Sequence, residues 1–364
     1  NSLTITGNAV FGDGTTDTVT GLTTLSVSGT STINTSTVTS SSTQLYTGNL
    51  TLGTSVTLTG STITTNGTLA GGTNSLTITG NAVFGDGTTD TVTGVNVLSV
   101  SGNTTIHTNT ITTTGTQTYG DTAASDTITL GNGTTLTTTN AQVTFNGTVN
   151  AEASEANALT LSVGTSEVEF NGAVGGGTNG SLGAISITGA LDLNAAITSA
   201  SSLSVSTTSD LGANVTTSGT QTYTGAVTLS AATTLTTTNS NVSFGSTIGN
   251  SSAQNLTLNT GSGTVSVTGT VGSVTALGTL TLTQTGGTTF SSTVNAATVT
   301  LTDTADAANI TFSGNVTATT FNTATQGYNV VFNGASNTIT NAVTFSNTGS
   351  VTLGNGSDTI AFTG

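Results

Sequence analysis

The sequence predicts an all-β chain that winds into a parallel β-helix, or β-solenoid, with about 20–24 residues per coil. Three observations support this fold class. Apolar residues alternate with Thr or Ser over short runs, Gly, Asn and Asp separate these runs, and one long segment recurs letter for letter. We therefore expect residues 1–364 to form a single solenoid segment of a longer chain, with right-handed coils.

Alternation with a period of two is the dominant local pattern, as in the runs at 3–5, 25–27, 56–58 and 128–130. This period is typical of strands with one face buried. Pairs such as T-G-N, N-G-T and G-D-G bound the runs and supply the positive φ values that tight corners need. The only stretch rich in helix-favouring residues is 150–159 (NAEASEANAL), which we expect to be a short insertion between strands.

An internal repeat is unambiguous. Residues 1–21 recur identically at 74–94, an offset of 74 − 1 = 73, and weaker similarity extends the two copies to 1–73 and 74–146. Repetition of this kind indicates stacked units that each bury a face against the next unit. The offset is not a multiple of one coil length, so the phase of each coil is left open.

Two further markers recur along the chain. The string T-Q-x-Y begins at 43, 116, 220 and 325 and contains all four tyrosines. Phenylalanines recur at intervals of 170 − 145 = 25, 312 − 290 = 22 and 332 − 312 = 20 positions, as the pairs Phe145 and Phe170, Phe290 and Phe312, and Phe312 and Phe332. These intervals match the length of one coil, which predicts that like side chains stack on successive coils.

Composition excludes several classes of partner. The chain has no Lys or Arg and 15 acidic residues, a formal charge of −15 spread over 4% of positions. Nucleic acids and anionic membrane surfaces are bound by cationic clusters, so neither is expected as a partner. No apolar run reaches the length of a membrane-spanning helix, so we expect no membrane insertion of this segment. Without Cys there are no disulfides and no thiolate metal sites.

The strings T-L-T-G-N, V-T-F-N-G-T-V and G-x-x-T-L-T-T-T-N resemble the repetitive passenger regions of filamentous-haemagglutinin-like and autotransporter-type adhesins of Gram-negative bacteria. The resemblance covers nearly the whole chain and rests on composition and architecture. It implies a right-handed parallel β-helix exported to the cell surface. The partners that it implies are host or neighbouring-cell surfaces and matrix polysaccharide.

Three corner loops are candidates for calcium. The string GNGSDTI at 354–360 matches most of a calcium-binding nonapeptide, and GDGTTDTV at 12–19 and 85–92 is one residue longer. Calcium takes six to eight oxygens, so one loop is insufficient unless stacked coils bring others alongside. The alternative is Asp–Gly corners that bond their own backbone. The candidate ligands are Asp13, Asp17, Asp86, Asp90 and Asp358, and no other cofactor is expected.

Signals for catalysis are weak, and we expect the protein not to be an enzyme. Glu167 and Glu169 project to the same outward side of a strand, which is also the pattern of an ordinary solvated face. His107, the only histidine, corresponds to Asn34 in the first repeat, so the position does not require an imidazole. The glycine string G-x-G-x-x-G at 175–180 precedes a strand, whereas a dinucleotide loop precedes a helix.

The function predicted from the sequence is a structural or adhesive segment of an extracellular bacterial surface fibre. Both ends of the sequence have the pattern of a strand within a repeat and not of a capping element. This predicts end-to-end stacking of copies into filaments. The main alternative is a solenoid that binds ice or another crystalline surface, because T-x-T strands place two Thr side by side on the outer face. In the sequence, however, these triplets are dispersed irregularly. A polysaccharide-active β-helix enzyme is a further alternative.

Overall fold

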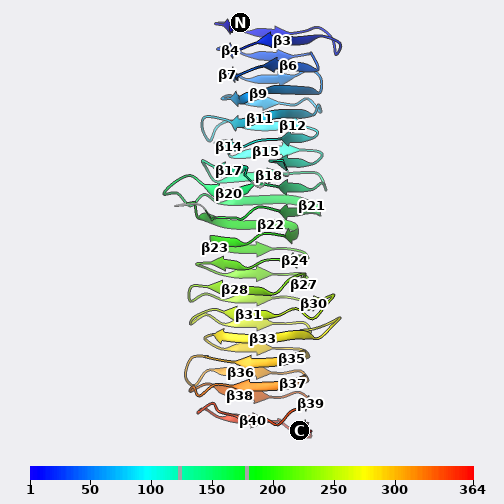
Figure 1. Cartoon of the computed structure of the whole chain (residues 1–364), viewed down its shortest axis with the longest axis vertical. Coiled ribbons are helices and arrows are strands. Elements are labelled where there is room, and N and C mark those ends of the chain that lie inside the picture. The colour runs from blue at the N-terminus through cyan, green and yellow to red at the C-terminus, as the bar shows by residue number, and fades with distance from the viewer. Residues whose placement is uncertain (122–124, 177–179) are drawn as a thin grey trace. The chain divides into compact units, whose positions relative to one another are not determined.

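A computed structural model describes residues 1–121, 125–176 and 180–364, which divide into two compact units, 1–189 and 190–364. Within these residues the chain contains strands and connecting turns and no helix (Figure 1). The strand pairings in these ranges are all parallel, and the chain forms about 17 turns of about 21 residues. The predicted β-solenoid is therefore confirmed. The stretch 152–158 is an irregular insertion between two strands, as expected.

The described residues of the first unit form 21 complete strands. They are β1 (Leu3–Ile5), β2 (Ala9–Phe11), β3 (Thr18–Leu22), β4 (Leu25–Val27), β5 (Ser31–Ile33), β6 (Thr37–Ser40), β7 (Thr43–Tyr46), β8 (Leu50–Leu52), β9 (Val56–Thr65), β10 (Leu69–Ala70), β11 (Leu76–Phe84), β12 (Thr91–Val95), β13 (Leu98–Val100), β14 (Thr104–Ile106), β15 (Thr110–Thr113), β16 (Gln117–Tyr119), β17 (Thr127–Leu130), β18 (Thr134–Thr137), β19 (Val143–Phe145), β20 (Thr148–Ala151) and β21 (Leu159–Phe170).

Strand β22 (Leu182–Leu193) includes the boundary between the units. The second unit continues with β23 (Ile197–Val205), β24 (Ser209–Leu211), β25 (Val215–Thr217), β26 (Gln221–Tyr223), β27 (Val227–Leu229), β28 (Thr233–Thr237), β29 (Val242–Phe244), β30 (Ile248–Asn250), β31 (Leu256–Asn259), β32 (Val265–Val267), β33 (Leu277–Gln284), β34 (Thr288–Phe290), β35 (Val294–Leu301), β36 (Asn309–Phe312), β37 (Val316–Thr323), β38 (Asn329–Phe332), β39 (Ser336–Ile339), β40 (Val351–Leu353) and β41 (Thr359–Phe362).

Three parallel ladders form the faces of the first unit. Ladder A contains β1, β4, β7, the second halves of β9 and β11, β14, β17 and β20. Ladder B contains β2, β5, β8, β10, β12, β15, β18 and the first half of β21. Ladder C contains β3, β6, the first halves of β9 and β11, β13, β16, β19 and the second half of β21.

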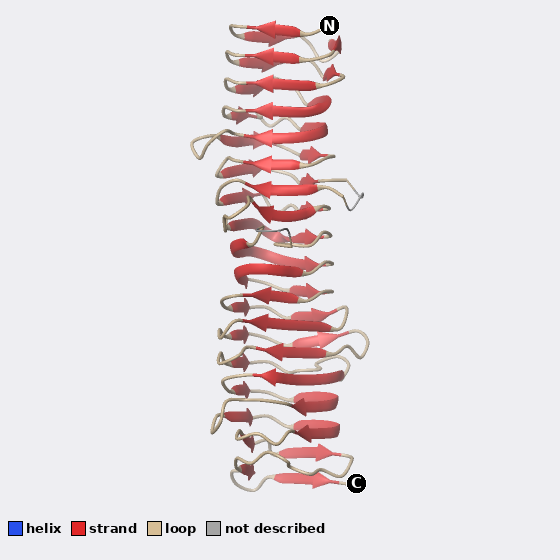
Figure 2. Cartoon of the chain, turned by 60° about the vertical axis from the view of Figure 1, so that its left-hand side comes forward, coloured by secondary structure: helices blue, strands red, loops and turns tan. Residues whose placement is uncertain are grey.

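The second unit repeats this three-faced arrangement (Figure 2). Its longest uninterrupted ladder, ladder F, contains the second half of β23, β26, β29, β32, β34, β36, β38 and β40. Ladder E contains the first half of β23, β25, β28, β31, β33 and the second halves of β35 and β37. The third face contains β24, β27 and β30, and later β39 and β41.

Alternating side chains explain why each strand has a buried and a solvated face. In β4, Leu25 and Val27 point inward and are fully buried, whereas Ser26 between them is partly exposed. Successive strands of a ladder lie about 4.8 Å apart, so an inward side chain contacts its equivalents above and below. Burial of one such Val or Leu stabilises the fold by about 1.5–3 kcal/mol.

Aromatic side chains stack within the core. On ladder C, the ring of Phe145 lies 5.4 Å from that of Tyr119 and 5.1 Å from that of Phe170, with interplanar angles of 14° and 8°. On ladder F, Phe312 lies 5.2 Å from Phe290 and 5.3 Å from Phe332. The phenylalanine intervals in the sequence therefore correspond to single turns, as predicted.

Three of the four T-Q-x-Y strings form the same buried pair. In β7, the Tyr46 hydroxyl donates to Gln44 Oε1 at 2.8 Å, and Gln44 Nε2 donates to the carbonyl oxygens of Val38 and Thr59 at 3.1 and 2.8 Å. These carbonyls belong to neighbouring coils, so the glutamine links one coil to the next. The pair recurs in β16 and β26, where Tyr119 and Tyr223 donate to their glutamines at 2.9 and 3.2 Å.

The fourth string, at 325, departs from this arrangement. Gln326 is exposed in the turn before β38, and the Tyr328 hydroxyl donates instead to the carbonyl oxygen of Leu301 at 2.9 Å. The central residue of the string is Gly327, whereas the other three strings have Leu or Thr there. Glycine is a poor strand former, and the turn before β38 includes this residue.

Burial of the tyrosines predicts a loss of stability at alkaline pH. Burial raises the pKa of Tyr46, Tyr119 and Tyr223 above the ordinary value of 10.0. The unfolded chain then releases these protons first, so their contribution is complete below pH 10 and is lost as pH rises from there. We expect the free energy of unfolding to fall by up to about 1.4 kcal/mol per pH unit for each tyrosine.

Denaturant unfolding at several pH values above 10 measures this slope. A variant carrying Phe at all three positions is expected to be less stable at neutral pH, because the glutamine acceptors lose their donors, but to show a flatter pH dependence. If the free energy of unfolding of this variant fell with pH as steeply as that of the unmodified chain, the three tyrosines would not be the cause of the alkaline loss of stability.

The two copies of the long repeat lie on different faces. The first copy begins with β1 on ladder A, and the second begins with the first half of β11 on ladder C, eleven strand positions later. With three strand positions to a turn, eleven positions are three and two-thirds turns. The offset therefore matches no whole number of coils, because the second copy is rotated around the axis by one face.

Candidate functional site

The loop at 12–17 is closed by its own aspartate. Gly12 has a φ of +73°, and Asp17 Oδ2 accepts the backbone N–H groups of Asp13 and Gly14 at 2.9 and 3.2 Å. These hydrogen bonds, with that of Asp13 first, lower the pKa of the Asp17 carboxyl below its ordinary value. The carboxylate thus stabilises the turn, which is the Asp–Gly corner that the sequence allowed as the alternative to calcium.

The other two candidate loops have the same construction. Asp90 Oδ2 accepts the backbone N–H of Asp86 at 3.2 Å, and Asp358 Oδ2 accepts that of Asn355 at 2.6 Å. Gly85 and Gly354, which precede these residues, have φ values of +75° and +85°. Each loop therefore directs one carboxylate oxygen into its own backbone.

The two identical candidate calcium loops lie three and two-thirds turns apart and at different corners. The loop with Asp13 and Asp17 lies at the corner between β2 and β3, whereas the loop with Asp86 and Asp90 lies at the corner between β11 and β12. These are corners between different pairs of ladders, so the loops do not stack. Within the described ranges, no group of three or more His, Cys, Asp or Glu side chains is placed to hold a metal. Calcium binding by these aspartates stays a prediction.

The carboxylates of Glu167 and Glu169 share one donor. Both side chains lie on the outer side of β21, with Val168 buried between them. Gln142 Nε2 donates to Glu167 Oε1 and to Glu169 Oε2, each at 3.1 Å, and the Thr144 hydroxyl donates to Glu169 at 3.3 Å. The structure thus brings the pair together as predicted, but around a neutral amide.

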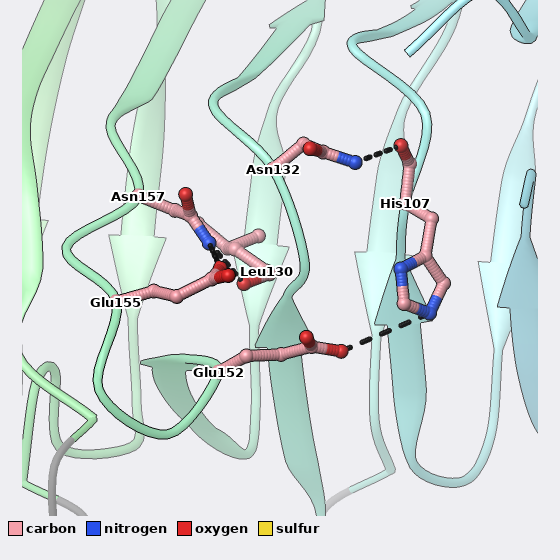
Figure 3. Close-up of polar contacts among 6 residues, drawn as sticks. All are labelled: His107, Leu130, Asn132, Glu152, Glu155 and Asn157. Atoms are coloured by element: carbon pink, nitrogen blue, oxygen red, sulfur yellow. Dashed lines mark hydrogen bonds and ion pairs between the residues drawn. The ribbon is translucent and has the colours of Figure 1, made fainter. Parts of the chain in front are cut away.

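His107 lies in a stack of three corner loops (Figure 3). Its Nε2 is 3.8 Å from Glu152 Oε1, and both side chains are partly exposed, at 31% and 40%. Asn132 Nδ2 donates to the His107 carbonyl at 2.6 Å, and Asn157 Nδ2 donates to the Leu130 carbonyl at 2.8 Å. The asparagines join successive loops, and an exposed ion pair of this kind contributes little stability.

The glycine string and a surface groove lie elsewhere on the chain. In the glycine string, Gly175 has a φ of +72° and strand β22 follows the string, while Gly177 lies outside the described residues.

In the second unit, a groove of about 300 Å³ is lined by residues that include Val227, Asn250 and Val274, the last of them 82% exposed. No pattern in the sequence indicates this groove, because Val274 lies in a turn outside the strand alternation.

Threonines lie in register on the outer side of ladder C. Thr37 and Thr39 of β6 pair with Thr57 and Thr59 of β9, which pair in turn with Thr77 and Thr79 of β11. We call these six residues the threonine array. The irregular dispersal seen in the sequence does not apply to this face, because its two coils have equal length, 57 − 37 = 20 and 77 − 57 = 20. Elsewhere the coils differ in length, which hides the register in the sequence.

The fold and these surfaces define a β-solenoid repeat protein whose outer faces are mostly neutral and rich in hydroxyl groups. No protein-family model, curated protein or solved structure matches the chain. The described residues contain no helix with the length and apolarity needed to cross a lipid bilayer.

Proposed function

We propose that this chain is a structural and adhesive segment of an extracellular bacterial surface fibre, with no catalytic role. The observation that supports this proposal most directly is the repetition of one inward and outward pattern through successive parallel strands of each unit. A scaffold of this kind grows by adding coils and presents the same type of surface at every turn. The resemblance to bacterial adhesin passenger regions supports the extracellular location and the adhesive role.

Copies of the chain are proposed to associate end to end. In β38 the inward Phe332 is fully buried, whereas its register partner Leu353 in β40 is 52% exposed. Phe362 of β41 is 40% exposed, although its partner Ile339 is buried. In a purified 364-residue segment this coil presents apolar side chains and a strand edge, which either a following coil or the end of another solenoid could cover.

Two experiments test the proposal. Labelling of intact source cells with an antibody to this segment is expected to detect it on the outer surface, and detection only after lysis would contradict the extracellular role. Sedimentation and electron microscopy of the purified chain at micromolar concentration are expected to show filaments.

A matched pair of variants tests the mode of association. Leu353→Lys is expected to abolish the filaments, because it places a charge in the apolar end surface. Thr352→Lys, on the outer side of the same strand, is expected to leave them intact. Monomeric behaviour of the unmodified chain, or equal effects of the two variants, would contradict axial stacking.

A further inference from the structure

We propose that the threonine array on ladder C is an ice-binding surface. The inference goes beyond the fibre role, since it assigns a ligand to particular residues. It is tested on the purified chain, so its outcome does not depend on where the protein is located or whether it forms filaments.

The array is a two-dimensional lattice. The three strands that carry it are register partners, so equivalent threonines repeat at about 4.8 Å from coil to coil. Within a strand, alternate residues are separated by about 6.7 Å. The inward residues between them, Val38, Leu58 and Ile78, are fully buried, which fixes the backbone beneath the array.

Hydroxyl side chains continue along the same ladder beyond the array. Thr77 is followed in register by Ser99, Thr118 and Thr144, so hydroxyl side chains occupy this position without interruption as far as β19. Beneath the later coils of the same ladder, the aromatic rings stack with interplanar angles of only 14° and 8°. The unbroken register keeps the outer side chains of successive coils in rows, which a crystal face requires.

The chemistry of the array suits ordered water. Each threonine presents one hydroxyl and one methyl group, and its β-branched side chain has a restricted χ1 angle. In the described part of the chain, none of the six hydroxyls forms a side-chain hydrogen bond with a protein group. They are therefore free to bond water at regular intervals, and the methyl groups between them limit where that water can lie.

A threonine cluster on ladder E of the second unit differs in this respect. On ladder E, Thr279 and Thr281 pair with Thr298 and Thr300. Asn322 Nδ2 donates to the Thr300 hydroxyl at 3.5 Å, and Asn341 Nδ2 donates to the Thr320 hydroxyl at 3.0 Å. Asparagine side chains thus interrupt that face and engage its hydroxyls, which favours ladder C over ladder E as the binding surface.

Ice is favoured over a crystalline polysaccharide as the ligand. Flat polysaccharide surfaces offer sugar rings, which proteins commonly bind by stacking aromatic side chains on them. All four tyrosines of this chain are fully buried in the core. The array offers neither aromatic rings nor charged groups, so its contacts are limited to hydroxyl and methyl groups.

Thermal hysteresis and inhibition of ice recrystallisation by the purified 364-residue chain test the inference. The unmodified chain is expected to show both effects. Thr57→Tyr, which places a large side chain at the centre of the array, is expected to reduce both to the buffer baseline. The matched control is Thr51→Tyr, an outward position on ladder B, which is expected to retain them.

Circular dichroism and thermal unfolding of each variant confirm that it is folded, and Thr57→Ser serves as a milder variant that removes only the methyl group. Its effect is expected to lie between those of the unmodified chain and Thr57→Tyr. The inference is overturned if the unmodified chain shows no hysteresis, or if Thr51→Tyr lowers the effect as much as Thr57→Tyr. Binding to crystalline cellulose or chitin without any effect on ice would also overturn it.

Discussion

Replacing Phe145 with alanine is expected to lower the free energy of unfolding by about 3–5 kcal/mol. The ring is fully buried and stacks on both sides, against Tyr119 and Phe170. Truncation leaves a cavity within the ladder and removes two ring contacts, each of which contributes about 0.5–1.5 kcal/mol beyond the area buried. Because every coil contacts only its neighbours, the loss cannot be shared across a distant core.

The midpoint of denaturant unfolding measures this loss, and Thr118→Ala provides the control. Thr118 lies one strand away on the same ladder with its side chain directed outward, so we expect a change within about 0.5 kcal/mol. Comparable effects of the two substitutions would show that the aromatic stack does not determine stability.

Replacing Gly80 with alanine is expected to destabilise the chain by about 3–5 kcal/mol. Gly80 has a φ of +125°, and a Cβ atom there would overlap the carbonyl oxygen of Gly60 in the neighbouring coil. Neither atom is the end of a flexible side chain, so the backbone itself would have to shift. The residue lies in β11 where that strand passes from one face to the next.

The repeat supplies an internal control for this prediction. Gly7 occupies the same place in an identical sequence, but a Cβ atom there would meet no atom within 4 Å. In this 364-residue chain, Gly7→Ala is therefore expected to be tolerated, with a change within about 0.5 kcal/mol. Thermal unfolding of the two variants distinguishes an effect of the local sequence from an effect of the neighbouring coil. Equal destabilisation would mean that the local sequence, and not the contact with the neighbouring coil, determines the loss of stability.

The fold could be predicted from the sequence because its signal is local. Alternation such as Leu25–Ser26–Val27 specifies which side chains are buried, and glycines such as Gly12 and Gly85 mark corners with positive φ. The aromatic stack could be predicted as well, since the spacing of Phe290, Phe312 and Phe332 is one coil length.

The candidate site could be predicted only in part, because the register between coils is a property of the tertiary structure. Coil length varies with the corner loops, so the sequence does not show that Thr37, Thr57 and Thr77 lie side by side. The same variation explains why the loops of Asp17 and Asp90, identical in sequence, lie at different corners. Local similarity also failed for Gln326, which is exposed in a turn although the other three strings bury their glutamine.

The rotated repeat also bears on how such a chain can lengthen. A recombination event that inserts one more copy of the long repeat adds three and two-thirds turns, so it turns every later strand of the unit onto another face. The inserted segment still packs, because each face accepts the same inward Val, Leu, Ile or Phe. The unit of growth is therefore a single strand with its corner, and genetic duplication need not respect whole coils. Each duplication of this kind moves a surface motif to a new side of its unit, so one gene can vary the direction in which it displays the same chemistry.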